Sequence, residues 1–458
     1  MDQRIVDDLV SIVGGDWVIT EYEQIEGYLS DETPKAVAPE PDAESVLVKP
    51  ADTSEIKDLL KYSNQNDIPL IPRGAGTGLC GAAVPTQPSI ILAMERLDEI
   101  LEIDQENMMV TCQAGAPLES LFESLEGTDL FFPPHPGDEG AQIGGLVVEN
   151  AGGARAVKYG VMRNYVQGLK MVLPTGEQCR LGGKILKNNT GYNLLQLIIG
   201  SEGTLGILTE VTLRLYPAPS TSATLIASFG NRRDAVQAVP KILRSGVTPL
   251  AIEYVDRTHI EKSADHLGEE WPAQSGTSDL ILIITGADEE ELYRTGESIS
   301  EVCTENGVQD ILMAERSKEQ ARILDIRSNL YSTYQPDMAE DLDIAVPPAS
   351  LADFLEVLEK VSSEFGVDIP TWGHAGDGNL HLHVMNEEGS PPDRLEELKD
   401  RLYTEAIELG GVISGEHGIG KTRKGNLSLM YSDKELELMR GIKSVFDPNG
   451  ILNPGAVV

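Results

Sequence analysis

Histidines gather in the C-terminal part of the chain, beside a glutamate, in a spacing that could support metal chemistry. Four of the seven histidines lie between positions 374 and 417. His381 and His383 are two residues apart, so in a β-strand both side chains point to the same face, and a glycine-rich turn can fold His374 back beside them. Imidazole nitrogens and a carboxylate bind divalent metals while leaving positions open for water or substrate. Each histidine alone is more often structural, but the cluster, followed by Glu416 and His417 between glycines, predicts a functional centre.

A second group of residues with a chemical signature is rich in glycine and lies in the N-terminal half. Three stretches stand out, at residues 72–78, 132–153 and 200–207. Glycines allow backbone N–H groups to turn inward and approach a diphosphate closely. The first stretch lacks the GxGxxG spacing of Rossmann domains, and no helix is expected directly behind it, which disfavours a nicotinamide-dependent dehydrogenase. One such stretch alone could be only a turn, but three in one domain predict a long phosphate-bearing ligand gripped by backbone.

The elements that position these residues are of mixed type, and they indicate two domains. Apolar patterning predicts helices where hydrophobic residues recur every three or four positions and strands where they alternate. In the first half, strands are expected at 45–49, 68–72, 90–94, 109–113, 167–173 and 207–215, with helices at about 52–63 and 117–125. After a Pro- and Ser-rich linker at 216–222, strands are expected at 224–229, 250–255, 280–285, 344–346 and 380–384, and helices at 232–244, 289–306, 351–365, 394–409 and 433–446. Residues 265–278 are expected to be a loop, and the predicted domains are 1–219 and 220–458.

The glycine-rich strings, in their order, resemble the FAD-binding domain of the vanillyl-alcohol oxidase (PCMH-type) superfamily. The strings are PRGAGTG, FPPHPG, GGLVVENAGG, KYG and GSEGTLGI. The resemblance is closest to the glycolate oxidase FAD subunit, D-lactate dehydrogenase and D-2-hydroxyglutarate dehydrogenase, and it covers about residues 40–458. It implies an α+β protein: a two-lobed PCMH-type FAD-binding domain, an α+β (ferredoxin-like) substrate-capping domain, and a C-terminal tail that returns to the FAD domain.

The resemblance also implies which residues hold FAD. The first loop would cradle the pyrophosphate and the other residues would line the remaining FAD site: Pro72, Arg73, Gly74, Ala75, Gly76, Thr77 and Gly78; Pro134, Gly137, Gly144, Gly145, Asn150, Gly152, Gly153, Tyr159 and Gly160; Gly203, Gly206 and Ile207. Relatives with covalent FAD often carry a histidine in the first loop, where this chain has Thr77, so FAD is expected to be non-covalent. His135 departs from the small polar or acidic residue usual in relatives and is expected to be a surface histidine.

For the histidine cluster, the resemblance implies a divalent metal, zinc or manganese, with ligands His374, His381 and Glu416. It places the catalytic base at His417, and Arg327 would bind the substrate carboxylate. A histidine suits the base because its pKa lies near neutrality. Hydride would pass from the substrate carbon to flavin N5.

Two positions bear on the choice of substrate. Asp341 and Leu342 stand where some relatives carry a lysine, so a clamp for a second carboxylate is not evident. His383 stands where several relatives have an asparagine that contacts substrate. The expected activity is therefore oxidation of D-lactate or glycolate to the 2-oxo acid.

Other functions stay open at this point. The chain could be a non-catalytic, electron-relaying FAD subunit of a glycolate oxidase-type complex, or a zinc hydrolase, although a hydrolase leaves the glycine loops unexplained. The electron acceptor could be an electron-transfer flavoprotein, an iron–sulfur protein, a quinone or oxygen. The oligomeric state is open, with a homodimer as one arrangement.

Composition narrows the partners and the cellular setting. The 458 residues carry a net charge of −38, with 74 acidic against 36 basic side chains, so nucleic acid and anionic membrane surfaces are disfavoured partners. Four scattered cysteines without CxxC spacing predict neither a disulfide framework nor an iron–sulfur cluster. No apolar run of about 18 residues is present, and no secretory signal is recognisable. The expectation is a cytoplasmic protein of a salt-adapted (halophilic) organism, with an ordinary acidic soluble protein as the alternative.

Overall fold

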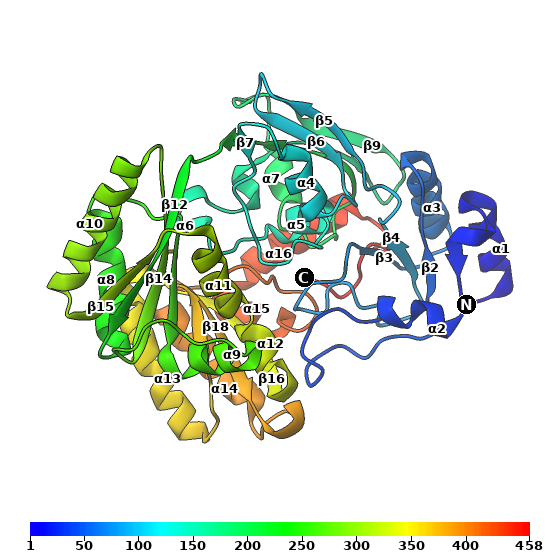
Figure 1. Cartoon of the computed structure of the whole chain (residues 1–458). Coiled ribbons are helices and arrows are strands. Elements are labelled where there is room, and N and C mark those ends of the chain that lie inside the picture. The colour runs from blue at the N-terminus through cyan, green and yellow to red at the C-terminus, as the bar shows by residue number, and fades with distance from the viewer.

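The computed structural model describes residues 1–458 except for the side chain of Glu388, and it has two parts that meet at its centre (Figure 1). The N-terminal part holds two sheets. The first has the order β1 (Val18–Ile19), β2 (Val46–Val48), β4 (Ile90–Ala93) and β3 (Leu70–Arg73), and the last three strands are parallel. The second is antiparallel, with the order β5 (Ile100–Asp104), β6 (Met109–Gln113), β10 (Ile207–Arg214), β8 (Val166–Val172) and β9 (Gln178–Gly182).

Seven helices and a small two-stranded sheet complete the N-terminal part. The helices are α1 (Gln3–Val13), α2 (Tyr22–Ile25), α3 (Thr53–Gln65), α4 (Leu118–Leu125), α5 (Ile143–Glu149), α6 (Ala156–Tyr159) and α7 (Leu194–Ile198). Asp52 caps α3 by accepting hydrogen bonds from the N–H groups of Ser54 and Glu55, which explains why this helix begins where the sequence predicts. The expected linker at 216–222 is partly built into β-strands. Its first two residues form β11 (Tyr216–Pro217), which pairs with β7 (Leu130–Phe131), and β12 begins at Thr221.

The C-terminal part is built on one antiparallel sheet of seven strands. Its order is β15 (Val308–Ala314), β12 (Thr221–Phe229), β14 (Ser278–Gly286), β13 (Ala251–Asp256), β17 (Thr371–His374), β18 (Asn379–Met385) and β16 (Met338–Ala345). One face packs against α8 (Arg232–Arg244), α10 (Glu289–Glu305), α13 (Leu351–Phe365) and α14 (Leu395–Glu408). The other face packs against α9 (Arg257–Leu267), α11 (Ser317–Ser328) and α12 (Leu330–Tyr334). The α+β class is thereby confirmed.

The last residues cross back to the N-terminal part, as the resemblance implies. After α15 (Leu427–Met430) and α16 (Asp433–Phe446), the N–H of Leu70 donates to the carbonyl of Ile451 at 2.8 Å. Leu452 is fully buried in the same hydrophobic core as β3 and β4. In Figure 1 the red α16 accordingly lies beneath α5 rather than with the C-terminal sheet.

Each of the two parts has one large hydrophobic core of its own. The larger N-terminal core takes its buried residues from positions 9–215 together with Leu452, and the larger C-terminal core takes its own from 223–413. The boundary between residues 219 and 220 itself stays a prediction.

Candidate active site

A cavity in the N-terminal part is walled by the three glycine stretches. It measures about 1310 Å³ including its open mouth. Of the predicted cofactor residues, those that line it are Pro72, Arg73, Gly74, Ala75, Gly76, Thr77, Gly78, Gly144, Gly145, Gly152, Gly203, Gly206 and Ile207. Glu416 and His417 from the far end of the chain also reach its wall. The predicted glycine loops therefore surround one cavity, and the fold brings Glu416 and His417 to its wall.

The first glycine loop lines the cavity, and the side chain of Arg73 packs against Gly76 of this loop. The guanidinium of Arg73 donates to the carbonyls of Ser30 at 2.7 Å and Gly27 at 3.0 Å, and the residue is buried. A Cβ at Gly76, where φ is +83°, would collide with this guanidinium. Among the described residues, the N–H groups of positions 75–79 donate to no protein acceptor, so they are free to bind an anion.

The second glycine stretch contains a helix where the sequence suggested only loops. Its Gly144 and Gly145 lie in the first turn of α5. A Cβ at Gly144 would lie 2.8 Å from the carbonyl oxygen of Ala114, whereas a Cβ at Gly145 would meet nothing within 4 Å. Gly144 thus lets the helix pack closely on β6 and its loop, and Gly145 leaves space on the cavity side.

The other predicted cofactor residues surround the cavity without lining it. They are Pro134, Gly137, Asn150, Gly153, Tyr159 and Gly160. Asn150 is left-handed at the end of α5 and accepts from the N–H of Arg163, and the Tyr159 ring packs against Phe131 and Tyr216. These contacts shape the wall, and direct contact of these residues with a cofactor stays a prediction. His135, predicted to be a surface histidine, pairs with Glu139 at 2.9 Å and stacks on Phe122.

Carboxylates at the cavity were missed from the sequence. Asp31, Glu149 and Glu202 all line it. Burial raises the pKa of Glu149 well above its ordinary value, and the charge of Glu202 raises it further. The carboxylate of Glu202 accepts from the N–H groups of Ile419 and Gly420, at 2.8 and 2.6 Å, and so fixes the histidine-bearing loop to the cavity wall.

The predicted metal ligands come together at the edge of this cavity. His374 ends β17 and His381 lies in the neighbouring β18, while Glu416 comes from the loop after α14. The Nε2 atoms of the two histidines lie 3.3 and 3.4 Å from Oε1 of Glu416, and one ligand atom from each residue falls within 4.8 Å of the others. Ligands about 2.0–2.2 Å from one zinc or manganese ion have this mutual spacing. The donor set therefore fits a divalent metal.

Electrostatics around this trio favour a cation. Although burial alone would lower it, the carboxylates of Glu253 and Glu416 raise the pKa of His374 well above its ordinary value. Burial lowers the pKa of His381 to about 3. Burial would raise the pKa of Glu416, but His374 and its hydrogen bond bring that pKa down to about 2. The carboxylates of Glu253 and Glu416 thus favour a positive charge at this position, which a bound metal would supply.

The loop that carries Glu416 and His417 is held by a buried carboxylate of β16. Oδ2 of Asp343 accepts from the N–H groups of Glu416 and His417 at 2.8 and 2.7 Å. Its Oδ1 accepts from the side-chain amide of Asn379 at 2.6 Å. Burial would raise the pKa of Asp343, but nearby His417 and His381 and the backbone donors hold it well below its usual range. Asp343 is therefore ionised and anchors both functional residues.

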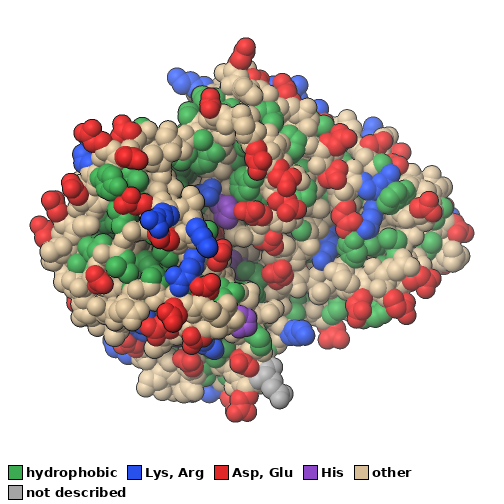
Figure 2. Space-filling model, viewed as in Figure 1, with side chains coloured by type: hydrophobic (Ala, Val, Ile, Leu, Met, Phe, Trp, Pro, Cys, Tyr) green, Lys and Arg blue, Asp and Glu red, His purple; other side chains and the backbone are tan. Residues whose placement is uncertain are grey.

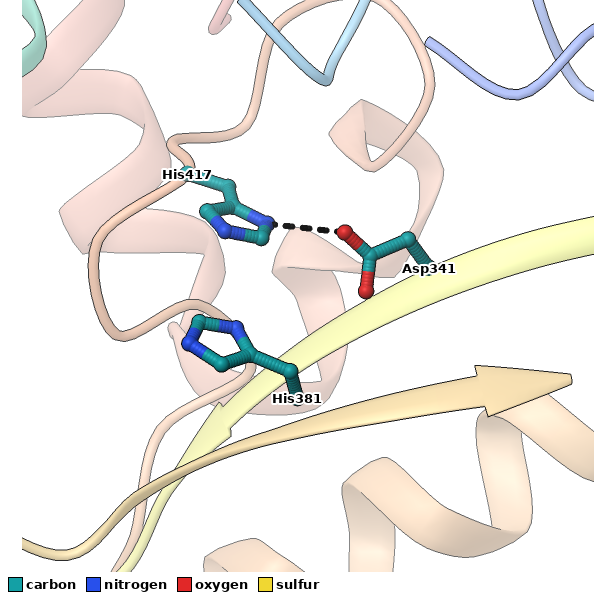
Figure 3. A group of neighbouring side chains, drawn as sticks. All are labelled: Asp341, His381 and His417. Carbon is teal, nitrogen blue, oxygen red and sulfur yellow. Dashed lines mark ion pairs between the residues drawn. The ribbon is translucent and has the colours of Figure 1, made fainter. Parts of the chain in front are cut away.

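His417 lies between the metal trio and the cofactor cavity. Its ring stacks on that of His381, with centroids 5.1 Å apart, and its Nδ1 lies 3.5 Å from Oδ2 of Asp341 (Figure 3). Asp341, His381 and His417 form a second group whose ligand atoms fall within 4.8 Å of one another. Burial raises the pKa of Asp341 to about 6 against the opposing effects of His417 and Arg423. His417 therefore faces both the candidate metal ligands and the cavity, which is where the expected base would have to lie.

His383 and Arg327 take internal partners. His383 is buried, stacks on Trp372 at 4.0 Å between centroids, and places Nδ1 3.3 Å from Oδ1 of Asp341. His381 and His383 thus approach the same carboxylate, as expected for residues on one face of a strand. The guanidinium of Arg327 donates through Nε and Nη2 to Oε2 of Glu253, at 3.0 and 2.5 Å. Its predicted contact with substrate stays a prediction, since its charge is already paired.

Comparison with known proteins identifies the family. A family model described as an FAD binding domain matches residues 44–182, and one described as FAD linked oxidases, C-terminal domain, matches residues 218–457. The chain is 40% identical over 442 residues to a D-lactate dehydrogenase of Archaeoglobus fulgidus, covering 96% of this chain and 97% of the relative. The chain belongs to the FAD-linked oxidases.

Other relatives of this FAD-linked oxidase carry related names. The glycolate oxidase subunit GlcD of Bacillus subtilis is 34% identical over 93% of this chain and 91% of its own, and a D-2-hydroxyglutarate dehydrogenase of Stutzerimonas stutzeri is 30% identical over 100% and 99%. Among solved structures, p-cresol methylhydroxylase with bound substrate has a TM-score of 0.80 at 18% identity, covering 99% of this chain and 96% of that one. Such a distant likeness shows the fold alone, and it confirms the PCMH-type fold expected from the glycine strings.

The cavity fits the FAD that the family implies. Free N–H groups in the first loop suit a diphosphate, and Oε1 of Gln142 and Oδ2 of Asp31 are buried without a partner among the described residues. Neither observation depends on the family assignment.

The four cysteines are free, and the described helices include none that is both long and apolar enough to span a bilayer.

Proposed function

We propose that this FAD-linked oxidase converts a small D-2-hydroxy monocarboxylate, D-lactate or glycolate, to the 2-oxo acid. The proposal includes non-covalent FAD and one divalent metal, zinc or manganese. The observation that carries it is the position of His417, which lines the cofactor cavity and stacks on a histidine of the metal trio. The named activities of the relatives support the same reaction class.

The residues divide the work of the reaction. His374, His381 and Glu416 would hold the metal, which supplies a Lewis acid for the substrate oxygen. Nδ1 of His417 faces Asp341, so Nε2 is the atom left to accept the hydroxyl proton. FAD in the cavity supplies the hydride acceptor. The Asp343 carboxylate keeps Glu416 and His417 in place throughout by holding their backbone N–H groups.

Charge near the base supports a substrate with one carboxylate. The buried Asp341 carboxylate lies between His417 and His383, and the guanidinium of Arg327 is paired with Glu253. A second substrate carboxylate placed here would meet a negative group rather than a free cation. The repulsion between the two charges would be strong, because the dielectric constant of a buried site is low. We therefore favour lactate or glycolate over 2-hydroxyglutarate.

The acidic surface supports a further part of the proposal, a salt-adapted cytoplasmic setting. Asp and Glu side chains are spread over the whole face shown in Figure 2, in line with the net charge of −38. Electrons would leave to a separate acceptor, which could be an electron-transfer flavoprotein, an iron–sulfur protein or a quinone. The Bacillus subtilis relative is named as a subunit of glycolate oxidase, which favours such an arrangement.

The test is anaerobic reduction of the bound flavin. The protein is purified in molar salt, and D-lactate, L-lactate, glycolate and D-2-hydroxyglutarate are added separately while flavin absorbance is recorded. We expect rapid bleaching by D-lactate or glycolate and release of the yellow colour on acid precipitation. Bleaching by none of the four acids would favour an electron-relaying subunit, and bleaching by D-2-hydroxyglutarate alone would overturn the choice of substrate.

A further inference from the structure

A buried glutamate on β13 joins two of the predicted functional residues. Glu253 is 2% exposed. Its Oε1 lies 2.7 Å from Nδ1 of His374, and its Oε2 accepts two hydrogen bonds from the Arg327 guanidinium. Sheet register creates this contact, because Tyr254 pairs with Gly373 and so sets the preceding Glu253 beside the following His374. Arg327 reaches the same carboxylate from α11.

We propose that Glu253 is the positioning residue of the metal centre, acting through His374. By accepting a hydrogen bond from Nδ1–H, it fixes the tautomer in which Nε2 carries the lone pair. That Nε2 is the atom 3.3 Å from Oε1 of Glu416, so the lone pair faces the other ligands. A carboxylate bonded to the outer nitrogen of a metal-binding histidine orients the ring and strengthens it as a ligand. The inference rests on the proposed function, since it presumes the metal trio.

The Arg327 guanidinium reduces the free-energy cost of burying the Glu253 carboxylate. A lone buried carboxylate is costly, but here the guanidinium offsets its charge while leaving Oε1 for His374. Because both guanidinium hydrogen bonds go to Oε2, Oε1 remains available to accept from Nδ1 of His374. Arg327, Glu253 and His374 therefore form one chain of contacts that ends at the metal.

The competing explanation is a purely structural ion pair, and the same sheet offers a matched control. Asp279 on β14 is fully buried and paired with an arginine, Arg257, at 2.8 Å, as Glu253 is with Arg327. Its other partners include Trp271 and Ser228, which lie outside the histidine cluster. Replacing either carboxylate leaves an arginine without its carboxylate partner, but only Glu253 touches a proposed metal ligand.

The experiment measures zinc affinity of the FAD-loaded protein by competition with a chromophoric chelator. We expect Glu253→Gln to bind zinc 10–100-fold more weakly, the usual effect of losing such a partner, and Asp279→Asn to bind it as the wild type does while melting at a lower temperature. Equal losses in both variants, or no loss in Glu253→Gln, would overturn the inference. Wild-type protein that binds no zinc would also overturn it.

A second measurement needs no variant of Glu253 and so does not depend on whether that variant folds. In zinc-loaded wild-type protein labelled with ¹⁵N-histidine, His374 should show a protonated Nδ1 and a metal-bound Nε2, assigned by the loss of its signals in His374→Gln. A metal-bound Nδ1 would overturn the inference. Failure of the proposed function is distinguishable, because it would appear as wild-type flavin that no hydroxy acid reduces while zinc binding and the tautomer behave as stated.

Discussion

Two adjacent glycines at the start of α5 should respond in opposite ways to the same added methyl group. A Cβ at Gly145 meets no protein atom within 4 Å and lies on the cavity side, whereas a Cβ at Gly144 lies 2.8 Å from both Cβ and the carbonyl oxygen of Ala114. Neither glycine has a positive φ, so alanine fits the backbone at both positions. The pair therefore separates a cost to folding from a cost to cofactor binding.

The magnitudes follow from these contacts. Alanine in place of glycine in a helix is favourable by about 0.5–1 kcal/mol, so Gly145→Ala should stabilise the FAD-free protein by that amount. The same methyl enters the space reserved for FAD, where overpacking costs about 1–3 kcal/mol, equal to a roughly 5- to 150-fold weaker Kd. Gly144→Ala should instead lower stability by about 1–3 kcal/mol, because Ala114 backbone atoms must shift.

The assay is thermal unfolding of FAD-free protein together with FAD titration followed by flavin fluorescence, both in molar salt. Gly145→Ala should melt at or above the wild-type temperature and bind FAD more weakly. Wild-type FAD affinity in Gly145→Ala would refute the assignment of this wall to the cofactor. A lower melting temperature of the same variant would refute the claim that its Cβ meets open space.

The other predictions concern the metal, the base and salt. Glu416→Ala should lose bound metal and flavin reduction together, measured by metal analysis beside stopped-flow absorbance, and retention of metal would show that Glu416 is not a ligand. His417→Ala should keep FAD and metal but slow single-turnover flavin reduction about 10²–10⁴-fold, the usual contribution of a positioned base, and a wild-type rate would contradict the mechanism. Lowering salt from molar to about 0.1 M extends the screening length from ~3 to ~10 Å, so self-repulsion at a net charge of −38 should lower the melting temperature. An unchanged melting curve would remove the argument for salt adaptation.

Amphipathic helices with clear caps were predictable from the sequence to the residue. The bounds of α8, α13 and α16 agree with the apolar spacing. Asn231 and Ser432 cap α8 and α16 through their side chains, so both the start signal and the periodicity are local. Capping residues and apolar periodicity can be recognised in a single sequence because they do not depend on contacts with distant parts of the chain.

The sequence did not predict the first half of β16, for a physical reason. The strand begins at Met338, whereas the sequence predicts a strand only at 344–346. Each buried acid has a distant partner: Lys399 lies 3.1 Å from Glu340, histidines face Asp341, and backbone N–H groups of the loop after α14 bind Asp343. Each partner lies more than 40 residues away in the sequence. The sequence alone therefore does not reveal that these acidic residues are buried and paired.

The same reason explains which site residues were found. The histidines were visible because they are close in sequence, and the glycine loops because their strings are distinctive. The sequence did not identify Glu253 and Asp341 as site residues, because their histidine partners lie on neighbouring strands. Only the register of the sheet sets Asp341 opposite His383. One signal could have helped: Asp341 and Asp343 alternate with Leu342 and Ile344, which is the pattern of a strand with one polar face.

The loop at residues 414–420 makes the metal trio and the cofactor cavity parts of one unit. Asp343 of the C-terminal sheet holds it from one side, and Glu202 of the N-terminal part holds it from the other. The two parts approach closely at two glycines, since a Cβ at Gly152 would lie 2.6 Å from Oε2 of Glu416, and a Cβ at Gly418 would lie 2.8 Å from Oε2 of Glu149. The position of Glu416, the proposed metal ligand, is therefore set by the same wall that shapes the cavity. A shift of one part against the other would displace Glu416 and His417 from the cofactor and from the histidines of the sheet at once, so the chemistry depends on how the two parts are docked as much as on the residues themselves.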